Sequence, residues 1–271
     1  MSMLASAHRG KSWRFPALLS VFTPVTAIKF GSVGALLLIW QLSSTLGWVS
    51  PVFFPAPREV WREASYLFQG GEIWSAVLVS SQRVFSGFGL AALISIPLGV
   101  MMAVWWPAKA AFDPLISLLR PLPSITWIPL TILWLGIGEG QKVAIVFMGT
   151  WIYVLIYTYE STRRVDPLLI RAARNLGANS FQIMRVVMMA ALPGIISGLK
   201  VTLAIAWSCV ITAEMVAAQI GLGALVWRAK DGANLGLVLV GMIGISITVL
   251  IADFIVERLE HIFLPWERLR R

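Results

Sequence analysis

The chain has 271 residues, a length that fits one or two ordinary domains. Hydrophobic residues make up 58% of it, against roughly half in a soluble domain, and charged residues only 13%, against about a quarter. So few ionised side chains exclude a water-soluble fold of this size, and 13 Trp with 13 Phe exclude a disordered chain. The sequence therefore predicts an integral membrane protein. Its single cysteine, Cys209, excludes an internal disulfide and any metal site built from several cysteines.

Stretches without charged residues mark the membrane segments, because a charge at the centre of a bilayer costs about 2.5–3.5 kcal/mol. A crossing helix needs about 20 residues, and six stretches approach that length once their flanks are counted. In chain order they are Phe30–Trp48, 84–108, 121–138, 143–159, Gly194–Ala218 and 232–252. All should be helices, since lipid gives an open backbone no hydrogen-bond partner and the alternation of a β-barrel is missing. We predict an all-α membrane protein with about six transmembrane helices.

Prolines in or beside these segments predict kinked or broken helices, because each removes one helical hydrogen bond. They are Pro97, Pro121, Pro123, Pro129 and Pro193. Kinked helices are common in transporters, but membrane proteins of other kinds contain them too.

Basic residues predict the orientation of the chain. The terminal segments and the connection between the fourth and fifth segments carry unmatched positive charge, whereas acids balance the basic residues of the other loops. Since Lys and Arg accumulate on the cytoplasmic side, both termini are predicted to be cytoplasmic, and the net charge of +9 does not require nucleic acid. The expected organisation is a cytoplasmic stub at 1–29, a transmembrane domain at 30–260 and a cytoplasmic tail at 261–271.

The cytoplasmic connection at about 165–190 has the pattern of two helices joined by a turn. Asp166 is a good N-cap acceptor, and Pro167 fits the first position of a helix. Gly177 supplies the left-handed residue that ends a helix at low cost, and Asn179 or Ser180 can cap the helix that follows.

The same segment has the composition of a docking element. Small residues, which leave room for another surface to approach, are bordered by arginines. The small residues are Ala172, Ala173, Gly177 and Ala178, and the arginines are Arg171, Arg174 and Arg185. Docking of a soluble partner and packing of an interfacial helix against lipid are both compatible with this pattern.

This stretch resembles the EAA loop of the membrane subunits of bacterial ABC importers, the binding-protein-dependent permease family. Ala172, Ala173 and Gly177 match the motif, Val187 stands at its Ile position, Arg171 replaces its Glu, and Met189-Ala190 replace its Leu-Pro. Other stretches are similar to the sulfonate, taurine and nitrate branch and follow its order. These are residues 49–60 (VSPVFFPAPREV), 119–130 (LRPLPSITWIPL) with 133–139 (LWLGIGE), 213–218 (AEMVAA) with 221–223 (GLG), and 264–266 (LPW).

The resemblance implies the transmembrane domain of a type I ABC importer, which works as a homodimer in the bacterial inner membrane. Two cytoplasmic ATPase subunits and a periplasmic substrate-binding protein would be its partners. ATP and Mg would bind the ATPases, because this sequence has no Gly-x-x-x-x-Gly-Lys-Ser/Thr phosphate loop. The chain itself would be no enzyme and would carry no cofactor or metal. Its helix at 166–176 would couple to the ATPase through Arg171, Ala172, Ala173, Gly177 and Ala178. The implied cargo is a small oxyanion, such as an aliphatic sulfonate, taurine or a nitrate-like ion.

Candidate residues of the translocation path are Trp207, Ser208, Thr212, Glu214 and Arg120. Trp207 and Glu214 are seven residues apart and share a helical face, while Ser208 and Thr212 lie on an adjacent one. A charge within a span indicates function by default, yet a carboxylate would repel an anionic cargo. For Glu214 we therefore favour an ion pair or a gate position, with Arg83 and Arg120 as candidate partners. Either arginine could instead help an anion to pass.

Three other functions stay open. The same architecture could import a vitamin or a pyrimidine precursor, because selectivity in such systems resides largely in the binding protein. An ATP-independent secondary carrier would show inverted repeats and paired broken helices, which we do not find in the sequence. A membrane-embedded enzyme would need a catalytic constellation such as His-Glu-x-x-His or Gly-x-Ser-x-Gly, and the sequence contains neither.

Overall fold

A computed structural model describes residues 24–50 and 54–263 of the chain. Residues 1–23 of the expected stub, and 264–271 with the LPW stretch of the expected tail, lie outside the described residues. Within the described ranges every regular element is a helix. The chain divides into two compact units, Met1–Arg58 and Glu59–Arg271.

The first unit contains α1 (Pro24–Thr45), which carries most of the first expected membrane segment. Large apolar side chains such as Leu36, Leu38 and Ile39 are more than 60% exposed along it, as suits a helix in lipid. The segment after α1 folds back on Trp40. The indole N–H of Trp40 donates to the Pro55 carbonyl at 3.1 Å, and its ring lies 5.3 Å from that of Phe54.

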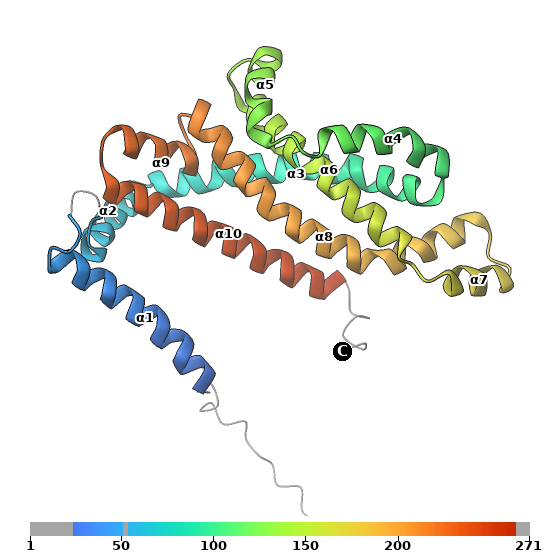
Figure 1. The fold of residues 1–271 in the computed structure, drawn as a ribbon, viewed down its shortest axis with the longest axis horizontal. Helices are drawn as coiled ribbons and strands as arrows, with labels where there is room; N and C mark the ends of the chain where they lie inside the picture. The colour runs from blue at the N-terminus through green and yellow to red at the C-terminus, as the bar shows by residue number, and fades with distance from the viewer. Residues whose placement is uncertain (1–23, 51–53, 264–271) are drawn as a thin grey trace, which may run out of the picture. The chain divides into compact units, whose positions relative to one another are not determined.

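The second unit is a bundle of long helices with short helices at its ends (Figure 1). The long helices are α3 (Glu72–Val104), α6 (Glu139–Arg163), α8 (Ser180–Ala217) and α10 (Leu235–Phe263). The shorter elements are α2 (Pro57–Gln69), α4 (Trp106–Leu119), the 3-10 helix η1 (Ser124–Trp127), α5 (Ile128–Leu135), α7 (Pro167–Asn175) and α9 (Leu222–Asp231). Helices α7 and α9 lie at opposite ends of the bundle.

Four described helices, α3, α6, α8 and α10, are long and apolar enough to cross a membrane. They contain the expected segment at 143–159 and most of those at 84–108, Gly194–Ala218 and 232–252, so these four predictions are confirmed. The fifth segment is an uninterrupted helix despite its two charges. Helices α4 and η1–α5 pass the same test only as a pair, which brings the total to five among the described residues. Helix α1 is not among these candidates.

The third expected segment, 121–138, differs from the prediction because it is not one helix. Helix α4 ends at Leu119, and the chain turns by 93° before η1 and α5. Pro121 and Pro123 lie in this turn, where a missing N–H and a fixed φ prevent the helix from continuing. Pro97 and Pro193, in contrast, lie inside α3 and α8, which remain single helices.

Small residues allow α6 to pack closely against α3 and α8. Gly87 and Gly99 of α3 lie against Val146 and Thr158 of α6, so these two helices run parallel. On the other side of α6, Gly149 meets Cys209 of α8 and Tyr157 meets Gly198, so α8 runs antiparallel to it. Such contacts are the usual basis of helix association in lipid, where apolar burial alone gives little driving force. The buried core lies along these two seams.

We predict that Gly87→Ala lowers the stability of the detergent-solubilised protein, whereas Gly89→Ala does not. A Cβ at position 87 would lie 2.6 Å from Cβ of Val146, while one at 89 meets no atom within 4 Å. Overpacking costs about 1–3 kcal/mol, whereas alanine gains up to about 1 kcal/mol over glycine in a helix. Thermal unfolding can be followed with a thiol-reactive dye, because Cys209 is the only cysteine and is 1% exposed. Equal melting temperatures for the two variants would contradict the prediction.

Candidate functional site

The segment after α6 folds as a short helix, a left-handed turn and a second helix, as its sequence predicts. Asp166 caps α7, since its Oδ1 accepts a hydrogen bond from the Leu168 N–H at 2.8 Å. Gly177 has φ +81°, and the N–H of the next residue, Ala178, reaches back to the Ala173 carbonyl at 3.0 Å. This closes the C-terminus of α7 in the manner of a Schellman motif.

A capping box starts the second helix. The Asn179 side chain accepts from the Gln182 N–H, and the Gln182 side chain accepts from the Asn179 N–H, both at 2.9 Å. Of the two capping candidates, Asn179 is therefore the cap, and Ser180 is the first residue of α8. Because α8 runs from this cap directly into the membrane, the turn is joined rigidly to a spanning helix.

Only a narrow side of α7 is attached to the bundle. Val165 is buried and Ile170 is half-buried, and they pack in a cluster with Val187 of α8. Of the five residues expected to meet an ATPase, Arg171, Ala172 and Gly177 are exposed, and Ala173 and Ala178 are half-buried. The structure thus leaves the predicted docking residues accessible at one end of the bundle (Figure 1).

Large apolar side chains, which the sequence reasoning did not single out, border the same turn. Leu176 is 88% exposed, Phe181 79% and Leu168 66%. A contiguous exposed apolar surface on a folded protein marks an interaction site. The sequence contains a sign of this surface, because the apolar Leu176 and Phe181 flank a polar glycine turn. Their exposure, however, depends on how α7 packs against the bundle.

At the opposite end of the bundle, a buried arginine joins three helices. Arg83 of α3 is 4% exposed and forms a two-pronged ion pair with Glu139 of α6, through Nε and Nη2 at 2.6 Å each. Its Nη1 also donates to Oε1 of Glu214 in α8 and to the carbonyl of Ile220, both at 2.7 Å. This guanidinium therefore has two carboxylate partners and one backbone acceptor.

Glu214 holds the turn between α8 and α9 in place. Its carboxylate accepts further hydrogen bonds from Ser80 Oγ at 2.7 Å and from the Gly223 N–H at 2.9 Å. The Leu222 N–H donates to Ser80 Oγ at 3.0 Å. Gly223 lies in the first turn of α9, where a negative charge is favourable. Glu214 is 1% exposed, so in this structure it is a structural anchor enclosed by its own chain.

The structure separates the predicted path residues into two groups. Trp207 and Glu214 are buried in the bundle, whereas Ser208 is exposed and Thr212 half-buried. The ion pair of Glu214 is with Arg83; Arg120 is exposed at the end of α4 and makes no ion pair within the described part of the chain. A path role for Ser208, Thr212 and Arg120 stays a prediction.

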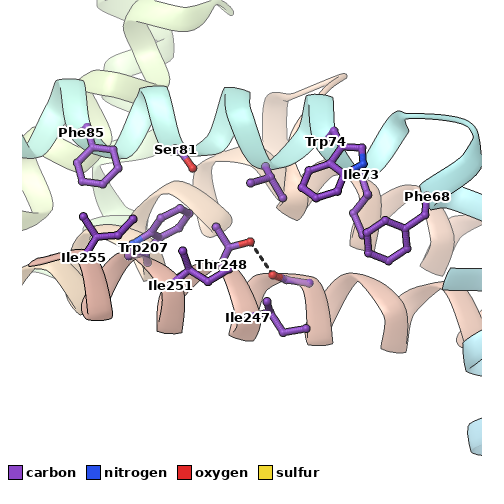
Figure 2. Close-up of a pocket in the computed structure, with 13 residues that line it drawn as sticks. Phe68, Ile73, Trp74, Ser81, Phe85, Trp207, Ile247, Thr248, Ile251 and Ile255 are labelled. Carbon is purple, nitrogen blue, oxygen red and sulfur yellow. Dashed lines mark hydrogen bonds between the residues drawn. The ribbon is translucent and has the colours of Figure 1, made fainter. Parts of the chain in front are cut away.

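Trp207 faces an apolar groove between α3 and α10 (Figure 2). The groove encloses about 240 Å³, and Trp74, Phe85 and Ile251 are among the side chains that line it. The indole N–H of Trp207 has no hydrogen-bond partner among the described residues. The Trp207 side chain therefore lies on the side of α8 that faces α3 and α10, whereas Ser208 lies on an exposed face of α8.

Comparison with known proteins places the chain in a family. A family model described as the inner membrane component of binding-protein-dependent transport systems matches residues 95–268. The chain belongs to this family. The resemblance seen at the Ala172–Gly177 segment is thereby confirmed, and the protein is a multi-pass component of the bacterial inner membrane.

Individual relatives match most of this chain. The taurine transport system permease protein TauC of Escherichia coli (strain K12) is 30% identical over 95% of this chain and 94% of its own length. The aliphatic sulfonates transport permease protein SsuC of the same strain is 31% identical over 84% and 87%. An inward-facing structure of the MetNI methionine ABC transporter matches with a TM-score of 0.55 at 21% identity, covering 69% of this chain and 92% of that one. The structural match shows a shared permease fold.

We predict that Glu214→Gln destabilises this permease far more than Glu139→Gln. Removing one partner of a buried ion pair costs about 3–5 kcal/mol, and because Arg83 keeps Glu139 we expect the lower end of that range. The Glu139 side chain is 65% exposed and Arg83 keeps its ion pair with Glu214, so the loss of Glu139 should cost less, about 1 kcal/mol. Thiol-dye melting in detergent measures both variants, and a Glu139→Gln effect as large as that of Glu214→Gln would be inconsistent with a buried anchor.

Proposed function

We propose that the protein is the membrane subunit of an ATP-driven importer that moves a small oxyanion into the cytoplasm. Two copies of this chain would form the pathway, with two cytoplasmic ATPase subunits and a periplasmic binding protein. ATP and Mg would bind the ATPases, and this chain would catalyse no reaction. The observation that carries the proposal is the exposed helix α7 with its glycine turn, in a chain of the binding-protein-dependent family.

Helix α7 has the properties that a coupling element requires. It is short, capped at both ends and exposed on most of its surface, and it presents Ala172 and Gly177 between exposed Leu168 and Leu176. Small residues allow another surface to come close, and the exposed leucines supply apolar area for that contact. A cleft on an ATPase subunit would bury this surface on docking.

The packing of α6 and α8 would carry a movement of α7 through the membrane. Both spans are joined directly to the α7 segment, and their contacts at Gly149 and Gly198 leave little room for sliding. At the far end, Arg83 and Glu214 hold α3, α6 and α8 together. ATP-driven closure of the two ATPases would therefore tilt these spans as a unit, which is a rigid-body switch between inward-facing and outward-facing states.

An oxyanion cargo is supported by the relatives, because taurine and aliphatic sulfonates both carry a sulfonate group. Nitrate-like ions share its small size and delocalised negative charge. Permease variants should be assayed in proteoliposomes with the ATPase and the binding protein present, since the binding protein would deliver the cargo.

The direct test is purification of the tagged chain from its host in a mild detergent, followed by identification of the proteins that accompany it. We expect an ABC ATPase in a one-to-one ratio and ATP-dependent uptake of radiolabelled taurine after reconstitution. Recovery of the bare chain with proton- or sodium-driven uptake would overturn the proposal.

We predict that Gly177→Leu releases the ATPase and abolishes transport while the spans stay folded. No atom lies within 4 Å of a Cβ at position 177, so leucine adds bulk to the outer surface and causes no internal clash. Gly71→Leu is the matched control, since Gly71 has φ +73° and equally open surroundings outside the α7 segment. Both variants bear the same left-handed strain of about 1–2 kcal/mol. Retention of the ATPase by Gly177→Leu, or equal loss in both variants, would count against docking at α7.

A further inference from the structure

A second pocket, of about 320 Å³, lies between α4 and α6 and differs from the groove of Figure 2 by its polar lining. Its polar side chains are Asp113, Ser117 and Arg120 of α4 and Tyr159 and Glu160 of α6. Nothing in the coupling segment or the Arg83 cluster involves these residues. The pocket therefore needs an explanation of its own.

Among the described side chains that line this pocket, one cation is uncompensated. Asp113 pairs with Lys109 one helical turn earlier, and Glu160 pairs with Arg164 at 3.6 Å. The side chain of Arg120 makes no ion pair or hydrogen bond within residues 24–50 and 54–263. Both acids of the pocket are thus neutralised, and the charge of the lining that remains available to a ligand is the guanidinium of Arg120. Arg163 lies next to the pocket, where it is hydrogen-bonded to Tyr159.

Two hydroxyl groups can assist Arg120. Ser117 lies three residues before it, so both are on one face of α4. Across the pocket, Tyr159 Oη accepts a hydrogen bond from Arg163 Nη1 at 3.2 Å, and this leaves its own proton free to donate. A planar guanidinium with nearby hydroxyl donors matches the oxygens of a sulfonate or phosphate, which accept several hydrogen bonds at once.

The position of Arg120 in the fold also indicates a ligand. It caps the C-terminal end of α4, at the 93° break of the bent span. A charged side chain within a membrane segment is costly and usually belongs to a functional site. We propose that Arg120, Ser117 and Tyr159 form an oxyanion-binding site, which holds the sulfonate group of the cargo on its way through the permease.

The choice of a sulfonate rests on the proposed function, whereas the affinity for an oxyanion rests on the pocket alone. A phospholipid phosphate offers the same chemistry, so the experiment must distinguish a free anion from a lipid headgroup. The full-length chain in nanodiscs of defined lipid can be titrated with radiolabelled ethanesulfonate, with uncharged ethyl methyl sulfone as competitor. Native mass spectrometry of the same samples measures bound phospholipid.

We expect Arg120→Gln to weaken ethanesulfonate binding at least about tenfold, since a charge-assisted hydrogen bond is lost, and Arg120→Lys to weaken it less. Arg228→Gln is the control, because Arg228 is an exposed, unpaired arginine of α9 within the described residues. Ser117→Ala and Tyr159→Phe test the hydroxyls if Arg120→Gln fails to melt like the wild type. The uncharged sulfone should not compete.

Binding of ethanesulfonate that does not depend on Arg120 would overturn the site, as would no binding at all. Loss of bound phospholipid alone in Arg120→Gln would overturn the cargo role and identify the oxyanion as a lipid headgroup. Uptake by the complete importer separates the two proposals. Normal ATP-driven sulfonate uptake with Arg120→Gln would leave the proposed function intact and refute this site, whereas a wild-type complex that transports no oxyanion would refute the function.

Discussion

One end of the bundle depends on the ion pairs that the guanidinium of Arg83 forms with two carboxylates. A cation buried in a membrane protein is tolerated only when opposite charges and hydrogen bonds surround it. Glu139 of α6 and Glu214 of α8 supply both, so two neighbouring helices are tied to the same cation of α3. Neutralising this one charge therefore fixes the relative positions of α3, α6 and α8, and through Gly223 it also fixes the start of α9.

Beyond the ion pairs, close packing of α6 against α3 and α8 holds the rest of the bundle together. Where Gly87 of α3 meets α6, and where Gly198 of α8 meets Tyr157, one of the two helices has no side chain at the point of contact. Close backbone approach replaces the hydrophobic driving force that lipid cannot provide. The result is a stiff assembly with the ion cluster at one end and the exposed α7 at the other. In the proposed mechanism, a push on α7 would reach the other end of the bundle through these packed seams.

The break between α4 and α5 does not rely on close packing of helices. A 93° bend at membrane depth exposes backbone groups that lipid cannot satisfy. The turn supplies its own partners, because the Arg120 N–H donates to the Ile116 carbonyl at 2.8 Å and the Thr126 hydroxyl to the Pro123 carbonyl at 2.7 Å. A self-contained break can present a charged side chain without disturbing the packed seams, which is why Arg120 rather than Arg83 remains available to a ligand.

The sequence by itself determined the local features. Charge-free stretches located four spans. Asp166, Gly177 and Asn179 marked the two ends of α7 and the start of α8, because caps and glycine turns depend on neighbouring residues only. The tertiary structure decided what distant residues do. Arg83 and Glu214 are 131 residues apart, and no spacing rule could prefer Arg83 over Arg120 as the partner. The sharp bend, the enclosure of Glu214 and the exposure of Leu176 likewise arise from helix packing, which places residues by contact and not by sequence separation.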